Sequence, residues 1–284
     1  MSGKWLLAAT ASTLMAAALC TWGALCLLFW QGSWQLLYHP VATVATTPAA
    51  DGLAFEPVAF AVGNDGIPQL TGWWIAAGSE AKLSRLTVLW LHGQDGNLGN
   101  SVDALRRLHA AGVNVLAFDY RGYGQSQFTH PSEAHWLQDA DWALDYLTAT
   151  RHMSPASIVL DGEGLGANLA LEVAAAHPEL AGVIAESPTA TPTDAIFDDA
   201  RAKLVPAQWL VHDRYDLGGA AKKVRVPVLW VSWAGRDGSD IAPAAYGMIA
   251  ERKTLVWLRA SPDADRDFAA ALARWFDDLP TAEP

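Results

Sequence analysis

Five residues, Gly162-Glu163-Gly164-Leu165-Gly166, have the spacing of G-x-S-x-G, a turn that presents a nucleophilic serine between a strand and a helix. In that turn the serine hydroxyl stands on a strained backbone, where a neighbouring histidine can deprotonate it. The central residue here is Gly164, which has no side chain, so no acyl intermediate can form on it. Glycine also removes a conformational cost of about 1–3 kcal/mol that a serine would carry in this backbone. Glu163 is the alternative nucleophile, although its side chain should leave the turn in a different direction.

The sequence lacks the residues that thiol, metal or nucleotide chemistry would require. Both cysteines, Cys20 and Cys26, lie in an N-terminal apolar segment, so the rest of the chain has no disulfide and no thiolate nucleophile. There is no H-E-x-x-H or C-x-x-C spacing for a metal, no Walker loop, and no G-x-G-x-x-G around Gly164. The sequence therefore predicts neither a metal site nor a cofactor.

The elements that must position the turn alternate between strands and helices. Continuous apolar runs are typical of strands that are buried on both faces of a parallel sheet. Such runs occupy residues 86–91, 113–118, 158–161, 182–185, 226–232 and 254–258, and a strand pair is predicted at 55–62 and 70–77. Helices are predicted from Ser101 as N-cap to Gly112, and over 134–150, 165–177, 241–250 and 268–279. Residues 191–216 form an irregular excursion. This order predicts an α/β fold with a mainly parallel central sheet and helices on both faces.

Several stretches in the right order resemble one family. His92-Gly93 after a buried strand, Asp119-Tyr-Arg-Gly-Tyr-Gly-Gln-Ser126 after the next, and the Gly162-x-x-x-Gly166 turn resemble the α/β-hydrolase fold. The segments Leu37-Tyr-His-Pro40, Asp65-Gly66 and Gly72-Trp-Trp74 are similar to the subgroup with a single N-terminal membrane anchor. The resemblance covers nearly everything after residue 35. It implies hydrolysis of esters, thioesters or amides by a Ser, Asp, His triad in that chain order.

The histidine base that the resemblance implies is missing from its position. In the family this residue lies in the loop after the last strand, where this chain has Asp263, give or take one residue, and no histidine follows His212. A carboxylate with an ordinary pKa near 3.9 is a poor proton acceptor from an alcohol. His92 is interpreted as part of a turn at the end of a strand rather than as a base.

The triad acid is the one member that the resemblance leaves in place. The run that begins at Val226 ends in Gly-x-Asp at Asp237, as the family's acid does. Two extra residues follow, so Asp240 competes for the same role. An aspartate without a histidine to orient has no triad function.

The oxyanion hole consists of backbone amides, which survive a change of side chain. By analogy with the family, the N–H groups of Gln94 and Leu165 would supply it. Loss of the serine or the histidine costs a serine hydrolase about a millionfold in turnover, yet about 10³–10⁴ over water can remain. Residual activity is therefore compatible with the sequence.

The N-terminal segment is long enough to cross a membrane. From Trp5 to Trp30 there are 26 consecutive residues without a charge, and about 20 are needed to span a bilayer. A cleaved signal is the alternative, but its apolar region is typically about 7–15 residues long. Lys4 precedes the segment and the next lysine is Lys82, so the positive-inside rule predicts a single-pass membrane protein with its domain on the non-cytoplasmic side.

The predicted organisation is a transmembrane anchor at 5–30, a stalk at 31–52 and an α/β-hydrolase domain at 53–280. The net charge of −11 argues against nucleic acid as a partner, because nucleic acid binds a basic face. The predicted partners are the membrane, through residues 5–30, and an acyl or lipid-like ligand; no protein partner can be named.

Three functions follow from these observations. The first is a membrane-anchored protein with a degenerate hydrolase centre that acts by binding a ligand or a partner. The second is a working esterase, thioesterase or peptidase whose nucleophile or base comes from elsewhere, for instance from residues 191–216. The third is a purely structural, membrane-tethered domain.

Overall fold

The computed structural model describes residues 3–234, 242–259 and 263–279. The chain forms two compact units. The smaller unit contains Met1–Tyr38 and Thr191–Arg214, and the larger unit contains His39–Ala190 and Tyr215–Pro284. Each unit is described by itself. Residues 31–52, predicted to be a stalk, are divided between the two.

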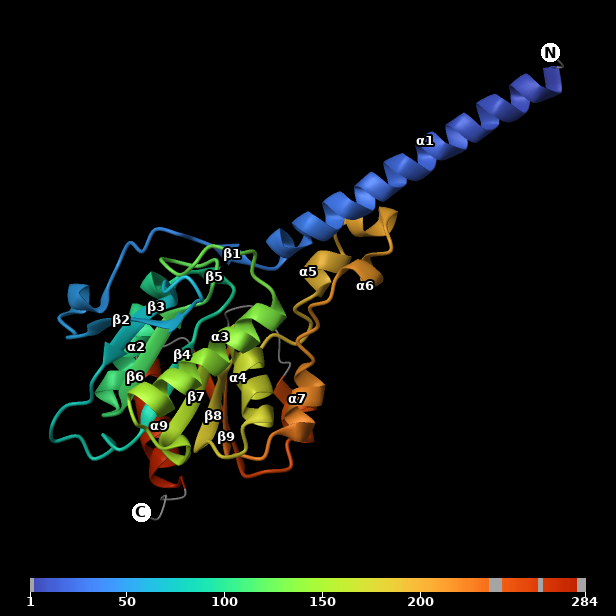
Figure 1. Cartoon of the computed structure of the whole chain (residues 1–284). Helices are drawn as coiled ribbons and strands as arrows, with labels where there is room; N and C mark the ends of the chain where they lie inside the picture. Colours follow the sequence, from blue (N-terminus) through green and yellow to red (C-terminus); the bar gives the residue numbers. More distant parts are fainter. Residues whose placement is uncertain (1–2, 235–241, 260–262, 280–284) are drawn as a thin grey trace. The chain divides into compact units, whose positions relative to one another are not determined.

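The larger unit is built on an eight-stranded sheet (Figure 1). Its order is β10-β9-β8-β7-β4-β6-β3-β2, and every neighbouring pair is parallel except β2 with β3 and β3 with β6. The strands are β2 (Glu56–Val62), β3 (Pro68–Ile75), β4 (Thr87–Leu91), β6 (Asn114–Asp119), β7 (Ile158–Glu163), β8 (Gly182–Glu186), β9 (Val228–Ala234) and β10 (Lys253–Arg259). A separate pair joins β1 (His39–Pro40) to β5 (Asp95–Gly96). The mainly parallel sheet that the sequence predicts is confirmed.

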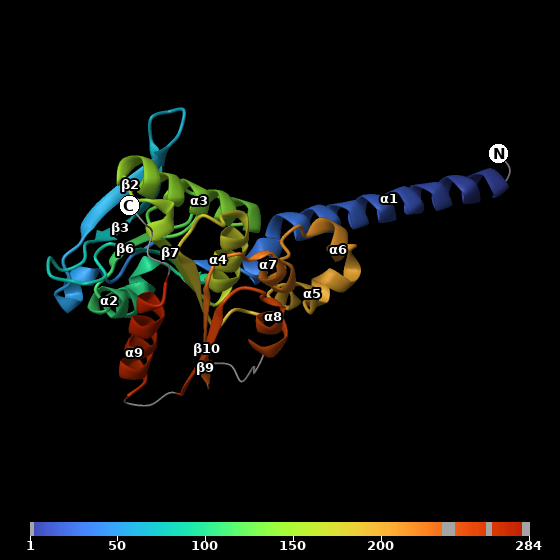
Figure 2. The same ribbon diagram turned by 90° about the horizontal axis from the view of Figure 1, so that it is seen from below.

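Helices cover both faces of this sheet (Figure 2). One face carries α2 (Val102–Ala110) and α9 (Ala264–Asp277). The other carries α3 (Glu133–Asp145) and α4 (Leu165–Ala176), with α7 (Leu217–Lys223) packed on α4 and α8 (Ala242–Met248) packed on α7. Shorter helical turns are η2 (Pro48–Asp51), η3 (Leu98–Ser101), η4 (Tyr146–Thr150) and η5 (Pro155–Ser157).

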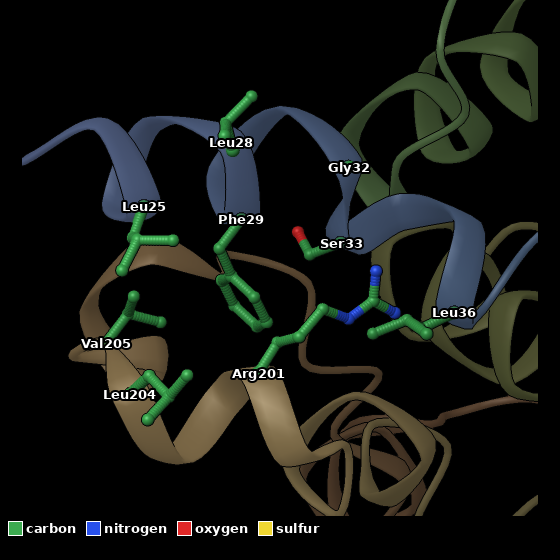
Figure 3. A pocket seen from close by; sticks show the side chains of 9 residues that line it. All are labelled: Leu25, Leu28, Phe29, Gly32, Ser33, Leu36, Arg201, Leu204 and Val205. Atoms are coloured by element: carbon green, nitrogen blue, oxygen red, sulfur yellow. The ribbon is translucent and has the colours of Figure 1, made fainter. Parts of the chain in front are cut away.

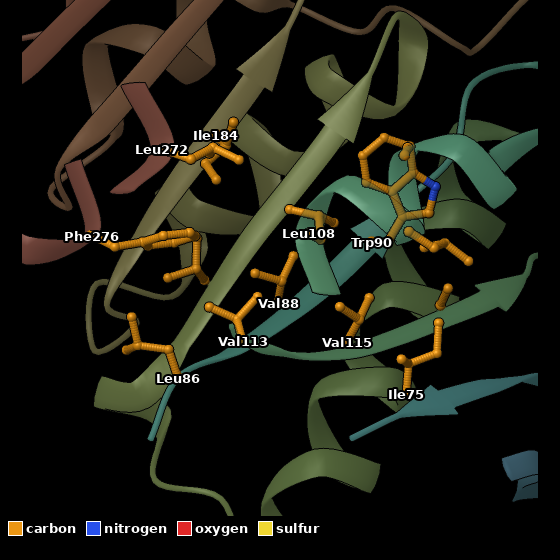
Figure 4. Close-up of a cluster of buried hydrophobic side chains, with 14 of the residues drawn as sticks. Ile75, Leu86, Val88, Trp90, Leu108, Val113, Val115, Ile184, Leu272 and Phe276 are labelled. Carbon is orange, nitrogen blue, oxygen red and sulfur yellow. The ribbon is translucent and has the colours of Figure 1, made fainter. Parts of the chain in front are cut away.

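The core beneath α2 and α9 explains why the strand runs are continuously apolar. Side chains of β4, β6 and β8 meet those of the two helices there, including Trp90, Val115, Ile184, Leu108 and Phe276 (Figure 4). All five are at most 1% exposed. A strand between two helical layers buries both of its faces, so apolar residues are needed at every position.

The start of α2 differs from the prediction. Ser101 makes no side-chain capping bond and its backbone is already helical. The cap is Asn97 instead, whose side chain accepts from the N–H of Gly99 at 2.9 Å, at the head of η3. Asn97 Nδ2 also donates to the carbonyls of Val41 and Thr43. These long-range bonds tie residues 41 and 43 of the predicted stalk to the start of η3 and favour Asn97 over Ser101.

The smaller unit consists of α1 (Gly3–Gly32), η1 (Ser33–Leu36), α5 (Asp194–Phe197), η6 (Ala200–Leu204) and α6 (Ala207–Leu210). Its segments are linked by a bond from Trp22 Nε1 to the Leu204 carbonyl and by one from the Tyr38 hydroxyl to Asp213. The mean hydropathy of the helix reaches 1.8 over an 18-residue window, and 6% of that window is buried. By length and composition, α1 can cross a membrane.

Candidate functional site

The turn between β7 and α4 keeps the conformation of a nucleophile-bearing turn although its central residue is glycine. Gly164 has φ +60° and ψ −121°, a backbone that side chains with a β-carbon rarely adopt. Its N–H donates to the carbonyl of Glu186, which fixes the turn against β8. A β-carbon at Gly164 would have Gln94 Oε1, 3.7 Å away, as its nearest neighbour. There is room for a side chain at this position, but the sequence supplies none.

The two outer glycines of the turn are required by close backbone packing. A β-carbon at Gly162 would lie 2.2 Å from the carbonyl oxygen of Gly166. One at Gly166 would lie 2.1 Å from the carbonyl oxygen of Leu91, at the end of β4. Real contacts are never that short, so these glycines let α4 approach the sheet at the point where the turn is raised above it.

The residues that the sequence assigns to the oxyanion hole lie next to this turn. Leu165 is the first residue of α4, where backbone N–H groups have no partner within the helix. Gln94 has its carbonyl held by the N–H of His39 and by the hydroxyl of Tyr123, both at 2.9 Å. Its side-chain oxygen reaches the space above Gly164. The structure therefore places Gln94, Gly164 and Leu165 together.

Among the other predicted site residues, the structure describes only Asp263. Asp263 is the N-cap residue of α9, where its side chain is 60% exposed and forms an ion pair with Arg266 at 3.0 Å. Asp237 and Asp240 lie outside the described residues; β9, which precedes them, ends at Ala234.

His92 belongs to the packing below the site. Its ring is 3% exposed and lies among the rings of Tyr120, Tyr123 and Trp136. Nδ1 is 2.7 Å from the carbonyl oxygen of Gly93, and Nε2 is 3.6 Å from Asp119 Oδ1. Burial raises the pKa of Asp119 to about 7. An enclosed imidazole with these contacts is part of the packing at the end of β4.

We expect His92 to stay neutral in the folded protein until the pH falls to about 4, because burial lowers its pKa from 6.5 to that value. In the unfolded chain the same ring takes up a proton near pH 6.5. Stability is therefore lost as the pH falls from 6.5 to 4, by about 3 kcal/mol at about 1.4 kcal/mol per pKa unit. A histidine NMR titration measures this directly, and a His92 signal that titrates near pH 6.5 would contradict the burial.

The structure also shows groups near the turn that the sequence does not single out. Ser187, directly after β8, has φ +46°, and its hydroxyl accepts from the N–H of Trp233 at 3.2 Å. Glu186 is 2% exposed and its carboxylate accepts from the indole N–H of Trp233 at 2.9 Å. Asp161 on β7 is fully buried. It is a polar residue in an otherwise apolar strand, and this signal is visible in the sequence.

Comparisons with known proteins agree with this architecture. Residues 83–232 match the family model described as serine aminopeptidase, S33. The uncharacterized protein Rv2307c of Mycobacterium tuberculosis is 30% identical over 223 residues, 77% of this chain and 74% of that protein. The alpha/beta hydrolase domain-containing protein WAV2 of Arabidopsis thaliana is 27% identical over 183 residues, 62% of this chain and 57% of its own.

Among solved structures, the esterase Pf2001 of Pyrococcus furiosus superimposes with a TM-score of 0.65 over 86% of this chain and 97% of its own. The two sequences are 18% identical, so this similarity shows a shared fold alone.

Proposed function

Because this chain belongs to the α/β-hydrolase family, we propose that it is a membrane-anchored member that binds a ligand at the turn where the family's fold presents a nucleophile. The observation that carries this proposal is Gly164. It has the strained backbone of a nucleophile position, at φ +60°, and no hydroxyl. The chain also has no histidine after residue 212, so both partners of the proton transfer are missing. A site that lacks nucleophile and base can still bind.

The chemistry that remains at the turn suits a carbonyl or carboxylate group. The N–H groups at the start of α4 point toward an incoming oxygen, and the helix dipole favours negative charge there. The absent side chain at Gly164 leaves additional room next to them. We therefore propose an acyl or lipid-like ligand, with its carboxyl end against Leu165 and Gln94.

The membrane anchor in this proposal is α1. The helix has no charged residue from Trp5 to Trp30, and only 6% of its most apolar window is buried by the rest of the chain. Such a helix needs an apolar surrounding, which a bilayer supplies. We place the larger unit on the non-cytoplasmic side, since Lys4, in the first turn of α1, is the basic residue next to its uncharged stretch.

The substitution Gly164→Ser is expected not to restore ester cleavage. The new hydroxyl would have no histidine to take its proton, and loss of the base alone costs about 10⁶-fold in turnover. The measurement is kcat/KM on p-nitrophenyl esters, with Gly164→Ala as the control that carries the same backbone strain without a hydroxyl. A turnover far above that of Gly164→Ala would contradict the proposal.

Ligand binding is tested separately by thermal melting of the full chain with long-chain fatty acids. A ligand at about 100 times its Kd raises the stability by about 2.7 kcal/mol. We expect a rise in Tm for the natural chain. The rise should be lost in Gly164→Leu, because the larger side chain occupies the site. No rise with any chain length would favour a structural domain.

A second candidate function, catalysis by a displaced nucleophile, is favoured by Ser187. A non-glycine residue at φ +46° is strained, and such strain concentrates at functional sites. The N–H of Gly164 donates to the carbonyl of Glu186, which is the residue before Ser187, so Gly164 and Ser187 lie close together. Labelling with a fluorophosphonate distinguishes the two functions. Rapid labelling of the natural chain that disappears in Ser187→Ala would establish the catalytic alternative, whereas no labelling supports binding.

A further inference from the structure

The smaller unit contains an apolar pocket of its own, with a volume of about 190 Å³. One wall is the C-terminal part of α1 and the other is η6 with the residue that follows it. The lining residues are Leu25, Leu28, Phe29, Gly32, Ser33, Leu36, Arg201, Leu204 and Val205. The volume suits part of one extended hydrocarbon chain rather than a whole drug-sized ligand, which needs about 300 Å³ or more.

The polarity of the pocket changes along the axis of α1. Figure 3 shows Leu25, Leu204 and Val205 at one end, and the guanidinium of Arg201 beside Ser33 at the other. The apolar end faces the N-terminal part of α1. A lipid in the adjoining leaflet has the same change of polarity, because its acyl chain lies toward the middle of the helix and its headgroup toward the C-terminal end.

The position of the pocket along α1 matches the boundary of a bilayer. From Trp5 to Leu25 a helix rises about 30 Å at about 1.5 Å per residue. The hydrocarbon core of a bilayer is also about 30 Å thick. With Trp5 in the interface, a core that begins about one helical turn later ends at about Phe29, so it includes the apolar end of the pocket and leaves Arg201 in the headgroup region. The bond between Trp22 and the Leu204 carbonyl keeps η6 at this depth.

Exposed side chains around the pocket are also of the kind found at a membrane interface. Leu204 is 62% exposed and Trp209 is 83% exposed. Lys203 lies beside Leu204 and is also exposed. Exposed apolar residues together with tryptophan and basic side chains are typical of the headgroup region.

Arg201 has donors for a headgroup even though Asp199 is bound to it. Its Nε and one terminal nitrogen donate to the carboxylate of Asp199 at 2.8 and 3.0 Å. A guanidinium has five N–H donors, so others remain for a phosphate. The contact with Asp199 fixes the plane of the guanidinium and also offsets its charge, so the site holds a lipid phosphate by hydrogen bonds more than by net charge.

We propose that this pocket binds a membrane glycerophospholipid, its acyl chain between Leu25, Phe29 and Val205 and its phosphate at Arg201. This lipid site lies within the smaller unit, is separate from the turn at Gly164, and rests on the proposed membrane anchor. It would hold the 191–214 segment at the membrane surface.

The experiment uses the full chain in vesicles of phosphatidylglycerol and phosphatidylcholine that contain a phospholipid with a diazirine on its acyl chain. After irradiation, mass spectrometry locates the captured lipid. We expect capture on residues 201–205. The variant Gly32→Leu should reduce it about tenfold, because a β-carbon there meets no atom within 4 Å and the side chain can fill the pocket. Gly23→Leu is the matched control, on the same helix and equally unobstructed.

A second pair of variants tests the headgroup. Arg201→Gln should reduce the capture about tenfold, the value of a charge-assisted hydrogen bond to the phosphate. Lys203→Gln, which removes a neighbouring charge that does not line the pocket, should leave most of it. Equal capture in Gly32→Leu and Gly23→Leu would overturn the pocket, and unchanged capture in Arg201→Gln would overturn the headgroup contact.

Extraction of the membranes with alkaline carbonate separates this inference from the proposed function. Retention of the chain without capture on residues 201–205 would refute the lipid site and leave the anchor intact. Release of the chain would refute the anchor, and the lipid site with it.

Discussion

The substitution Gly166→Ala is expected to destabilise the larger unit by about 4 kcal/mol or more, a large part of the stability of a typical domain. Its β-carbon would lie 2.1 Å from the Leu91 carbonyl oxygen and 2.5 Å from that of His92. Both obstacles are backbone atoms at the end of β4, so no side chain can rotate away to relieve the contact. The helix would have to move off the sheet. Urea denaturation of the membrane-free domain or of the full chain in detergent measures the loss.

Gly164→Ala is the matched control for this prediction. Its β-carbon has only Gln94 Oε1 near it, at 3.7 Å, so the cost arises from the left-handed backbone alone. That cost is about 1–3 kcal/mol. Equal losses in the two variants would mean that the turn does not pack as described. A smaller loss in Gly164→Ala than in Gly166→Ala matters for function. It would show that a side chain is sterically permitted at Gly164, where the natural chain has none.

The turn and its surroundings could be predicted from the sequence because their causes are local. Gly162, Gly164 and Gly166 follow one strand and begin one helix, and that spacing specifies a strand-turn-helix unit whatever lies elsewhere. The continuous apolar runs likewise require two covered faces, which predicts the parallel sheet. The position of Gln94 beside Gly164 follows from two neighbouring parallel strands, β4 and β7, that end at the same edge.

The features that sequence reasoning missed depend on contacts between distant segments. The cap at Asn97 is favoured over Ser101 by bonds to Val41 and Thr43, more than 50 residues earlier. The strained backbone of Ser187 is held by its N–H bond to Val231 and by the bond from Trp233 to its hydroxyl, both on β9. Neither strand register nor such bonds can be read from local composition. The local signal that the sequence does offer for such a feature is a polar or small residue at the end of a strand.

The buried carboxyl group of Asp161 makes the stability of the larger unit depend on pH. It is fully buried, and neither carboxylate oxygen has a hydrogen-bond partner among the described residues. Burial, and then the negative charge of Glu186, raise its pKa well above the ordinary value, while Arg107 opposes the shift. The folded state therefore binds a proton that the unfolded chain releases near pH 4. The stability that this proton gives is complete below pH 4 and is lost as the pH rises toward the raised pKa.

The variant Asp161→Asn cannot ionise, so it is expected to exceed the natural chain in unfolding free energy by at least about 2 kcal/mol at pH 8 and to differ little at pH 4. Asp139→Asn is the contrasting control. Asp139 is equally buried but accepts from the N–H and Nε of Arg121, at 2.8 and 2.5 Å. Removing that carboxylate leaves a buried cation and should cost about 3–5 kcal/mol at pH 8. Urea denaturation at the two pH values gives both results.

If Asp161→Asn instead destabilised the protein at pH 8, the carboxylate would have to be ionised and paired in the folded state. Its strand ends at the turn of Gly164, and Glu163 and Glu186 adjoin it there. If Asp161→Asn increases the unfolding free energy, the natural chain retains a buried acid that lowers its stability. This acid lies beside a turn whose central residue is a glycine. Such a cost has no benefit for folding, so the gain would point to selection on the site itself, through the ligand that it binds.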